Sequence, residues 1–137
     1  MSADCAVLAI ERHSFAKADS WSSIFPAELK RRNTVLLCAV DCSGKVLGYL
    51  VFTFSKLATH ISKVAVADPH RKRGVATLLV QAALRWRRSL CATLHVDPAN
   101  AAALALYARL GFTEDGLLTD YYAPGRPALK MVLELAS

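Results

Sequence analysis

Three consecutive cations stand where an apolar, strand-like segment meets a helix-like one. They are Arg71, Lys72 and Arg73, which lie between the apolar run Val64–Val66 and Gly74. Cations at a helix N-terminus oppose the helix dipole at a cost of roughly several tenths of a kcal/mol each. A bound anion reverses that cost, because free N–H groups and cations then share one phosphate, and Gly74 lets the backbone approach it. The pattern favours a phosphate-binding turn, although charge alone fits a solvated basic turn equally well.

This turn resembles the central motif of the GNAT superfamily of N-acetyltransferases, Arg/Gln-x-x-Gly-x-Gly/Ala. The Walker and dinucleotide-binding patterns are both absent. The resemblance implies acetyl-CoA as cofactor, with its pyrophosphate held by Arg71, Lys72, Arg73, Gly74, Val75, Ala76 and Thr77. It also implies that the strand formed by Val64, Ala65 and Val66 pairs with the pantetheine arm.

A second motif lies at Asn100, Ala103, Tyr107, Gly111 and Phe112. It is similar to the Asn-x-x-Ala-x-x-x-Tyr-x-x-x-Gly-Phe pattern of GNAT members that acetylate protein N-termini. Asn100 and Tyr107 are seven residues apart, which places them on one helix face about 10.5 Å apart along the axis. The resemblance implies that Asn100 holds the cofactor arm and that Tyr107 protonates the departing thiolate. Taken alone, Tyr107 fits a half-buried core tyrosine better, and the motif around it reverses that preference.

Two histidines are candidates for proton transfer. His95 stands in Leu94-His95-Val96, a triplet in which some eukaryotic N-terminal acetyltransferases also carry histidine. An imidazole with a pKa near 6.5 suits an α-amine with a pKa near 8, so we expect His95 to be the general base. His60 is expected to assist it, as a tyrosine does in some relatives. Both residues also fit structural roles, and Cys91 is a weaker candidate nucleophile because it has no motif partner.

Three aromatic residues are expected to frame the acceptor. Tyr121 and Tyr122 resemble the tyrosine pair on the loop between the last two strands of N-terminal acetyltransferases, and Phe15 matches a contact to the first side chain. The resemblance implies that the acceptor is the N-terminus of a peptide or protein. Ordinary aromatic packing, and transfer to a lysine side chain or a small-molecule amine, remain alternatives.

The elements that would position these residues follow from periodicity and turn signals. Helices are predicted at 3–15, 26–32, 74–90 and 100–110, and strands at 34–40, 45–55, 61–66, 93–96, 112–118 and 128–135. In the helix at 74–90 the expected buried stripe is Val75, Leu78, Leu79, Ala82, Trp86 and Leu90. Residues 124–127 are expected to be loop.

This order predicts an α/β (mixed α+β) fold of the GNAT type. A central twisted mixed sheet of about six strands would be flanked by helices. The pattern shows no counterpart of the strand that relatives carry before the first helix. Either the sheet is one strand short, or a partner subunit or homodimer covers its edge.

Length and composition set the remaining expectations. The 137 residues, 54% of them hydrophobic, suit one domain spanning 1–137 with a core of its own. We expect a cytoplasmic protein with no metal and no membrane partner, since cysteine spacing, apolar run lengths and the N-terminal charge give no such signal.

The net charge of +6 leaves a nucleic-acid binder as a competing class. Its contacts would be Lys30 to Arg32 and Arg85 to Arg88, but no recognised binding motif accompanies them. A catalytically dead CoA-binding regulator is the other alternative, which the presence of both His95 and Tyr107 disfavours. We therefore expect no nucleic-acid partner.

Overall fold

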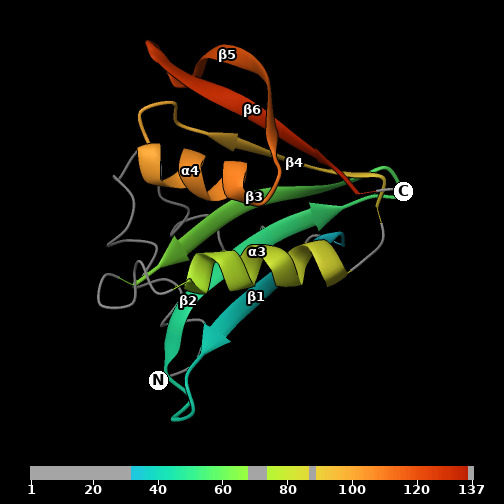
Figure 1. The fold of residues 1–137 in the computed structure, drawn as a ribbon, viewed down its shortest axis with the longest axis vertical. Helices are drawn as coiled ribbons and strands as arrows, with labels where there is room; N and C mark the ends of the chain where they lie inside the picture. Colours follow the sequence, from blue (N-terminus) through green and yellow to red (C-terminus); the bar gives the residue numbers. More distant parts are fainter. Residues whose placement is uncertain (1–31, 68–73, 87–88, 136–137) are drawn as a thin grey trace.

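The computed structural model describes residues 32–67, 74–86 and 89–135, together with the backbone but not the side chains of Tyr122 and Ala123. The described residues form six strands and two helices (Figure 1). The strands are β1 (Thr34–Val40), β2 (Val46–Phe54), β3 (Ala58–Val66), β4 (Cys91–Val96), β5 (Thr113–Ala123) and β6 (Arg126–Glu134). The helices are α3 (Val75–Trp86) and α4 (Ala101–Arg109). No described helix is long and apolar enough to span a bilayer.

The strand order is β1-β2-β3-β4-β6-β5, which confirms the predicted mixed sheet. Only the β3–β4 pair is parallel, and the other neighbours are antiparallel. Helix α3 is the crossover between β3 and β4, as a parallel pair requires. The expected helices at 3–15 and 26–32 lie outside the described residues, apart from Arg32, which lies in a turn. The strand expected to be missing before the first helix also belongs to the part of the chain that is not described.

Strands β3 and β4 pair over only four residues and then part. Their register runs from Ala58 opposite Cys91 to Ile61 opposite Leu94. Beyond that point β3 continues beside β2 as far as Val66, while β4 continues beside β6 as far as Val96. A bulge interrupts the β2–β3 register at Ser62, where the parting begins, and bulges commonly re-aim strands next to active sites.

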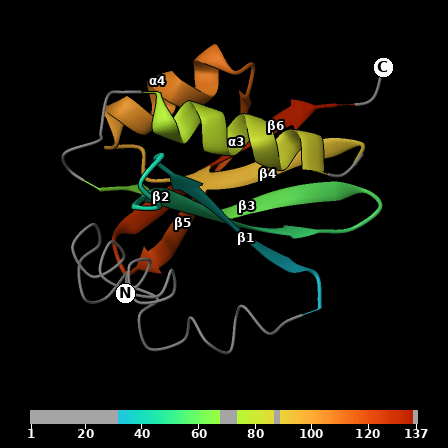
Figure 2. The ribbon, with the colours of Figure 1, turned by 90° about the horizontal axis from the view of Figure 1, so that it is seen from below.

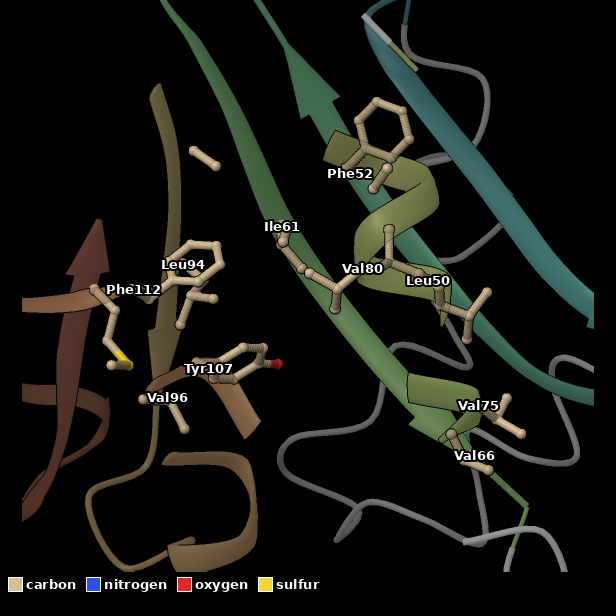
Figure 3. Packing of buried hydrophobic residues seen from close by; sticks show 14 residues of the cluster. Leu50, Phe52, Ile61, Val66, Val75, Val80, Leu94, Val96, Tyr107 and Phe112 are labelled. Atoms are coloured by element: carbon tan, nitrogen blue, oxygen red, sulfur yellow. The ribbon is translucent and has the colours of Figure 1, made fainter. Parts of the chain in front are cut away.

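One hydrophobic core fills the space between the sheet and both helices. Figure 2 shows α3 and α4 on the same side of the sheet. Strands β2, β3 and β4 contribute alternate residues to this core, among them Leu50, Phe52, Ile61 and Leu94, and Figure 3 shows them converging on Val80 and Tyr107. The residues between them in the strands must therefore point to the opposite face.

The buried stripe of α3 differs from the expected one. Leu78 and Trp86 are 64% and 57% exposed, and Leu90 lies beyond the helix and is also exposed. The helix instead buries Val75, Leu79, Val80 and Ala83. Because α3 is apolar almost all round, its periodicity fits two overlapping stripes, and only docking against the sheet chooses between them.

Candidate active site

The end of β3 and the start of α3 flank the turn that the sequence motif predicts to bind a phosphate. Gly74 has φ +79°, and its carbonyl accepts the first helical hydrogen bond, from the N–H of Leu78 at 3.0 Å. A Cβ at Gly74 would meet no heavy atom of the described residues within 4 Å. The first turn of α3 carries no acidic residue to offset the dipole. These features fit an anion at the helix N-terminus, while Arg71, Lys72 and Arg73 lie outside the described residues.

Gly48 is a positioning residue that the sequence pattern did not reveal. It lies on β2 opposite Val66, and a Cβ built there would come within 2.7 Å of the carbonyl oxygen of Ala65. Any larger residue would therefore push the end of β3 away from β2. Nothing in a lone glycine between apolar residues signals this close approach, since it depends on the neighbouring strand.

Helix α4 presents Tyr107 to the region where the strands part. The side chain is 8% exposed and makes an edge contact with Phe112, with ring centroids 5.8 Å apart. Figure 3 shows its hydroxyl directed away from α4 and toward β3. Asn100 caps the helix, since its Oδ1 accepts a hydrogen bond from the N–H of Ala103 at 3.1 Å. This cap accounts for Asn100 structurally, and its expected contact with a cofactor stays a prediction.

The two histidines meet on the opposite face of the sheet. Thr93 pairs with His60 across the β3–β4 ladder, and His95 is the first β4 residue beyond it. The Nδ1 atom of His60 lies 2.8 Å from Oγ1 of Thr93, and the ring centroids of His60 and His95 are 5.2 Å apart. The buried Nδ1 of His95 has no hydrogen-bond partner among the described residues. An orphaned ring nitrogen beside parting strands is suited to receive a proton or a water.

The surroundings of both histidines lower their pKa and so favour the neutral form. Burial, and after it the positive charge of Lys130, lowers the pKa of His95 below its ordinary value. Burial also lowers the pKa of His60, with smaller contributions from the charges of His95 and Lys130. Lys130 pairs with His95 across the β4–β6 ladder, which explains its effect. A lowered pKa keeps an imidazole free to accept a proton at neutral pH.

Tyr121 lies over His95 as a stacked ring, with centroids 4.7 Å apart and planes 28° apart. The expectation that the tyrosines lie on a loop is wrong. Tyr121 and Tyr122 belong to β5, and the turn is reduced to Pro124 and Gly125. The last two residues of the loop predicted at 124–127 belong to a strand instead, because Arg126 pairs with Ala123 and begins β6, which also contains Pro127.

A bulge in β5 turns Tyr121 toward His95. Between Leu118 and Ala123 four residues of β5 face only Pro127 of β6, which has no N–H for the ladder. Within this bulge Asp120 adopts φ +54°, and its Oδ1 accepts a hydrogen bond from the N–H of Gly125 at 2.6 Å. The carboxylate therefore closes the hairpin around the bulge. Phe15 and the side chain of Tyr122 lie outside what the structure describes.

Cys91 lies away from this cluster. It begins β4, four residues before His95, which corresponds to about 13 Å along a strand. Its Sγ is 3.7 Å from the carbonyl oxygen of Leu57. The described residues also hold no cluster of metal-ligating side chains.

Comparison with known proteins identifies the family. Residues 5–112 match the model of the Acetyltransferase (GNAT) family, and the chain therefore belongs to that family. The GNAT resemblance seen in the two sequence motifs is thus confirmed.

Individual relatives carry related names. An N-alpha-acetyltransferase of Sulfurisphaera tokodaii is 27% identical, with 92% of this chain and 85% of that protein aligned. The N-terminal acetyltransferase A complex catalytic subunit NAA10 of Arabidopsis thaliana is 33% identical over 71% of this chain, which spans only 55% of that protein. Among solved structures, the ribosomal-protein-S18-alanine N-acetyltransferase of Escherichia coli superposes with a TM-score of 0.84 at 23% identity, covering 100% of this chain and 92% of that one. This last likeness concerns the fold.

Proposed function

We propose that the chain transfers acetyl from acetyl-CoA to the α-amine of a peptide or protein N-terminus. The observation that carries this proposal is the cluster of His60, His95 and Tyr121 where β3 and β4 part. Family membership supports acetyl-CoA as the donor, and relatives named as N-alpha-acetyltransferases support the acceptor class.

The donor side is proposed to be the end of β3 and the first turn of α3. Gly74 and the N–H groups of the helix turn that follows it suit the pyrophosphate, and the sequence motif adds Arg71 to Arg73. The Val64–Val66 segment of β3, which β4 no longer accompanies, offers backbone groups to the pantetheine amides. When bound, acetyl-CoA supplies an acetyl group already activated as a thioester.

The acid and the base lie on opposite faces of the sheet. Tyr107 belongs to the core that contains Leu94, whereas His95, the next residue of β4, points to the other face. A carbonyl held between the parting strands is thus open to an amine from the His95 side and to proton donation from the Tyr107 side. This arrangement lets one side chain take the proton of the attacking amine while another protonates the departing thiolate.

The acetyl group then passes directly from the thioester sulfur to the amine, without a covalent enzyme intermediate. The amine nitrogen forms a bond to the acetyl carbon while His95 accepts the proton that the nitrogen loses, directly or through one water. A backbone N–H of the Val64–Val66 segment stabilises the oxygen on which negative charge develops. The carbon–sulfur bond breaks, and Tyr107 gives the thiolate its proton.

The lowered pKa of His95 favours an α-amine over a lysine. An α-amine has a pKa near 8 and is partly neutral at pH 7, whereas a lysine amine with a pKa near 10.4 would need about 3 kcal/mol more to deprotonate. A weak, neutral imidazole is therefore matched to the first acceptor and poorly matched to the second.

Acetylation of a peptide library with labelled acetyl-CoA tests the proposal. Peptides that differ at their first two residues, each with one internal lysine, are compared with polyamines, and mass spectrometry locates the label. We expect label on α-amines. Label confined to internal lysines or to polyamines would overturn the acceptor assignment while leaving the chain an acetyltransferase.

A further inference from the structure

A row of polar side chains runs from the histidine cluster to the far edge of the sheet. Thr34 pairs with Thr53, Thr53 with His60, and His60 with Thr93, across β1, β2, β3 and β4. Residues directly opposite one another in a sheet share a face. Thr93 shares its face with His95 two positions on, so the whole row lies on the face where the acceptor is proposed to bind.

A hollow of about 480 Å³ opens over this row, at the start of β1. Its polar lining comprises Arg32, Asn33, Thr34, Thr53, Ser55 and His60. The hydroxyl of Ser55 is already engaged, because it accepts hydrogen bonds from the N–H groups of Leu57 and Ala58 in the β2–β3 turn. Arg32, Asn33 and the two threonines therefore give the hollow its binding capacity.

The described lining of the hollow carries a positive charge and no negative one. Arg32 is its only Lys, Arg, Asp or Glu among the described lining residues, and burial lowers the pKa of His60 there, which favours the neutral ring. A guanidinium is always charged and offers its donors in a planar fork that matches a carboxylate. Asn33 and the threonine hydroxyls add neutral donors around it. A carboxylate is consequently the group that this lining fits best.

We propose that the hollow is a subsite for an acidic side chain of the acceptor peptide. The inference rests on the proposed function, because it needs a peptide whose α-amine lies at His95. His60 joins the two regions, since its ring lies 5.2 Å from that of His95 and also lines the hollow.

The dimensions place the acidic residue early in the peptide. Neighbouring strands are about 4.8 Å apart, so Thr34 lies about 10 Å from His60 along the row. An extended peptide advances about 3.3 Å per residue. An acidic side chain at the second, third or fourth residue would therefore reach Arg32.

Acceptor peptides that carry Glu, Gln or Lys singly at these three positions provide the test, with acetylation measured at the α-amine. We expect kcat/KM for Glu to exceed that for Gln about fivefold at one position or more, which corresponds to an exposed charge pair of up to about 1 kcal/mol. Arg32→Gln should abolish the preference, and Arg32→Glu should turn it toward Lys. Arg109→Gln, which removes a distant exposed charge on α4, is the matched control and should leave the preference intact.

The outcomes separate the two proposals. Equal kcat/KM for the Glu, Gln and Lys peptides at every position overturns the subsite and leaves α-amine acetylation standing. An equal effect of Arg32→Gln and Arg109→Gln also overturns it, because the preference would then reflect net charge. If no peptide of any sequence is acetylated at its α-amine, the proposed function fails and the subsite falls with it.

Discussion

The ring of Tyr121 stacks on the ring of His95 at a centroid distance of 4.7 Å, although the two residues come from strands separated by β6. The contact covers one face of the proposed base while Tyr121 itself stays 47% exposed. Stacked aromatic pairs contribute about 0.5–1.5 kcal/mol beyond the area that they bury. The tyrosine therefore orients the imidazole and shields that one face of the ring from solvent.

We expect Tyr121→Ala to raise the pKa of His95 toward its ordinary value near 6.5, because burial is the main cause of the present lowering. Tyr121→Phe keeps the ring and should keep the pKa. NMR titration of the imidazole in both variants checks this directly. An identical His95 titration in the Ala and Phe variants would show that Tyr121 does not shield the base.

We expect Asp120 to affect acceptor binding by holding the backbone of the β5 bulge in place. Its positive φ and its hydrogen bond to Gly125 shape the bulge that carries Tyr121. Asp120→Asn tolerates the left-handed conformation and keeps an acceptor oxygen, whereas Asp120→Ala loses the bond and adds strain of about 1 kcal/mol. We expect KM for the acceptor to rise in the Ala variant only, with KM for acetyl-CoA unchanged in both. Equal acceptor KM values in the two variants would assign Asp120 no positioning role.

The pH dependence of kcat/KM should show two ionisations on its acid side. Below the α-amine pKa near 8 the logarithm should fall with unit slope, and below the lowered pKa of His95 the slope should steepen to two. His95→Gln should slow the reaction and remove the second bend. Lys130→Gln should move that bend to higher pH, since removing a like charge raises the pKa. A second bend that survives in His95→Gln belongs to another group.

Tyr107→Phe should lower kcat about 10²-fold or more if the phenol is the general acid. The ring and its contact with Phe112 are preserved, so affinity for acetyl-CoA, measured by isothermal titration, should change little. A Phe variant with full kcat would mean that water protonates the thiolate.

Gly48→Ala should weaken acetyl-CoA binding. Its new Cβ would lie 2.7 Å from a backbone oxygen of β3, so the strand must shift, and overpacking of this kind costs about 1–3 kcal/mol of stability. Gly44→Ala is the control, because Gly44 has φ +86° in the β1–β2 turn and its Cβ meets nothing within 4 Å. We expect both variants to lose stability and only Gly48→Ala to lose affinity in isothermal titration. Equal affinities would show that the end of β3 does not hold the donor.

Local chemistry in the sequence was sufficient for the order of the described elements. The strand at Thr34–Val40 has its predicted bounds, and α4 ends before Gly111, which adopts φ +101° as a residue after a helix commonly does. These features depend on residues close in the chain, so periodicity and turn chemistry predict them. The family motifs likewise singled out His95 and Tyr107, whose catalytic roles stay predictions.

Only the tertiary structure decided which residues meet. Alternation along β4 predicts that His95 and Leu94 face opposite sides of the sheet. It does not predict that Tyr121 stacks on His95 or that Tyr107 lies near Leu94. The rotation of α3, the close approach at Gly48 and the bulge opposite Pro127 all depend on a neighbouring strand or helix distant in sequence. Such contacts follow from packing and register across the whole sheet, whose energies are not encoded in any local window of residues.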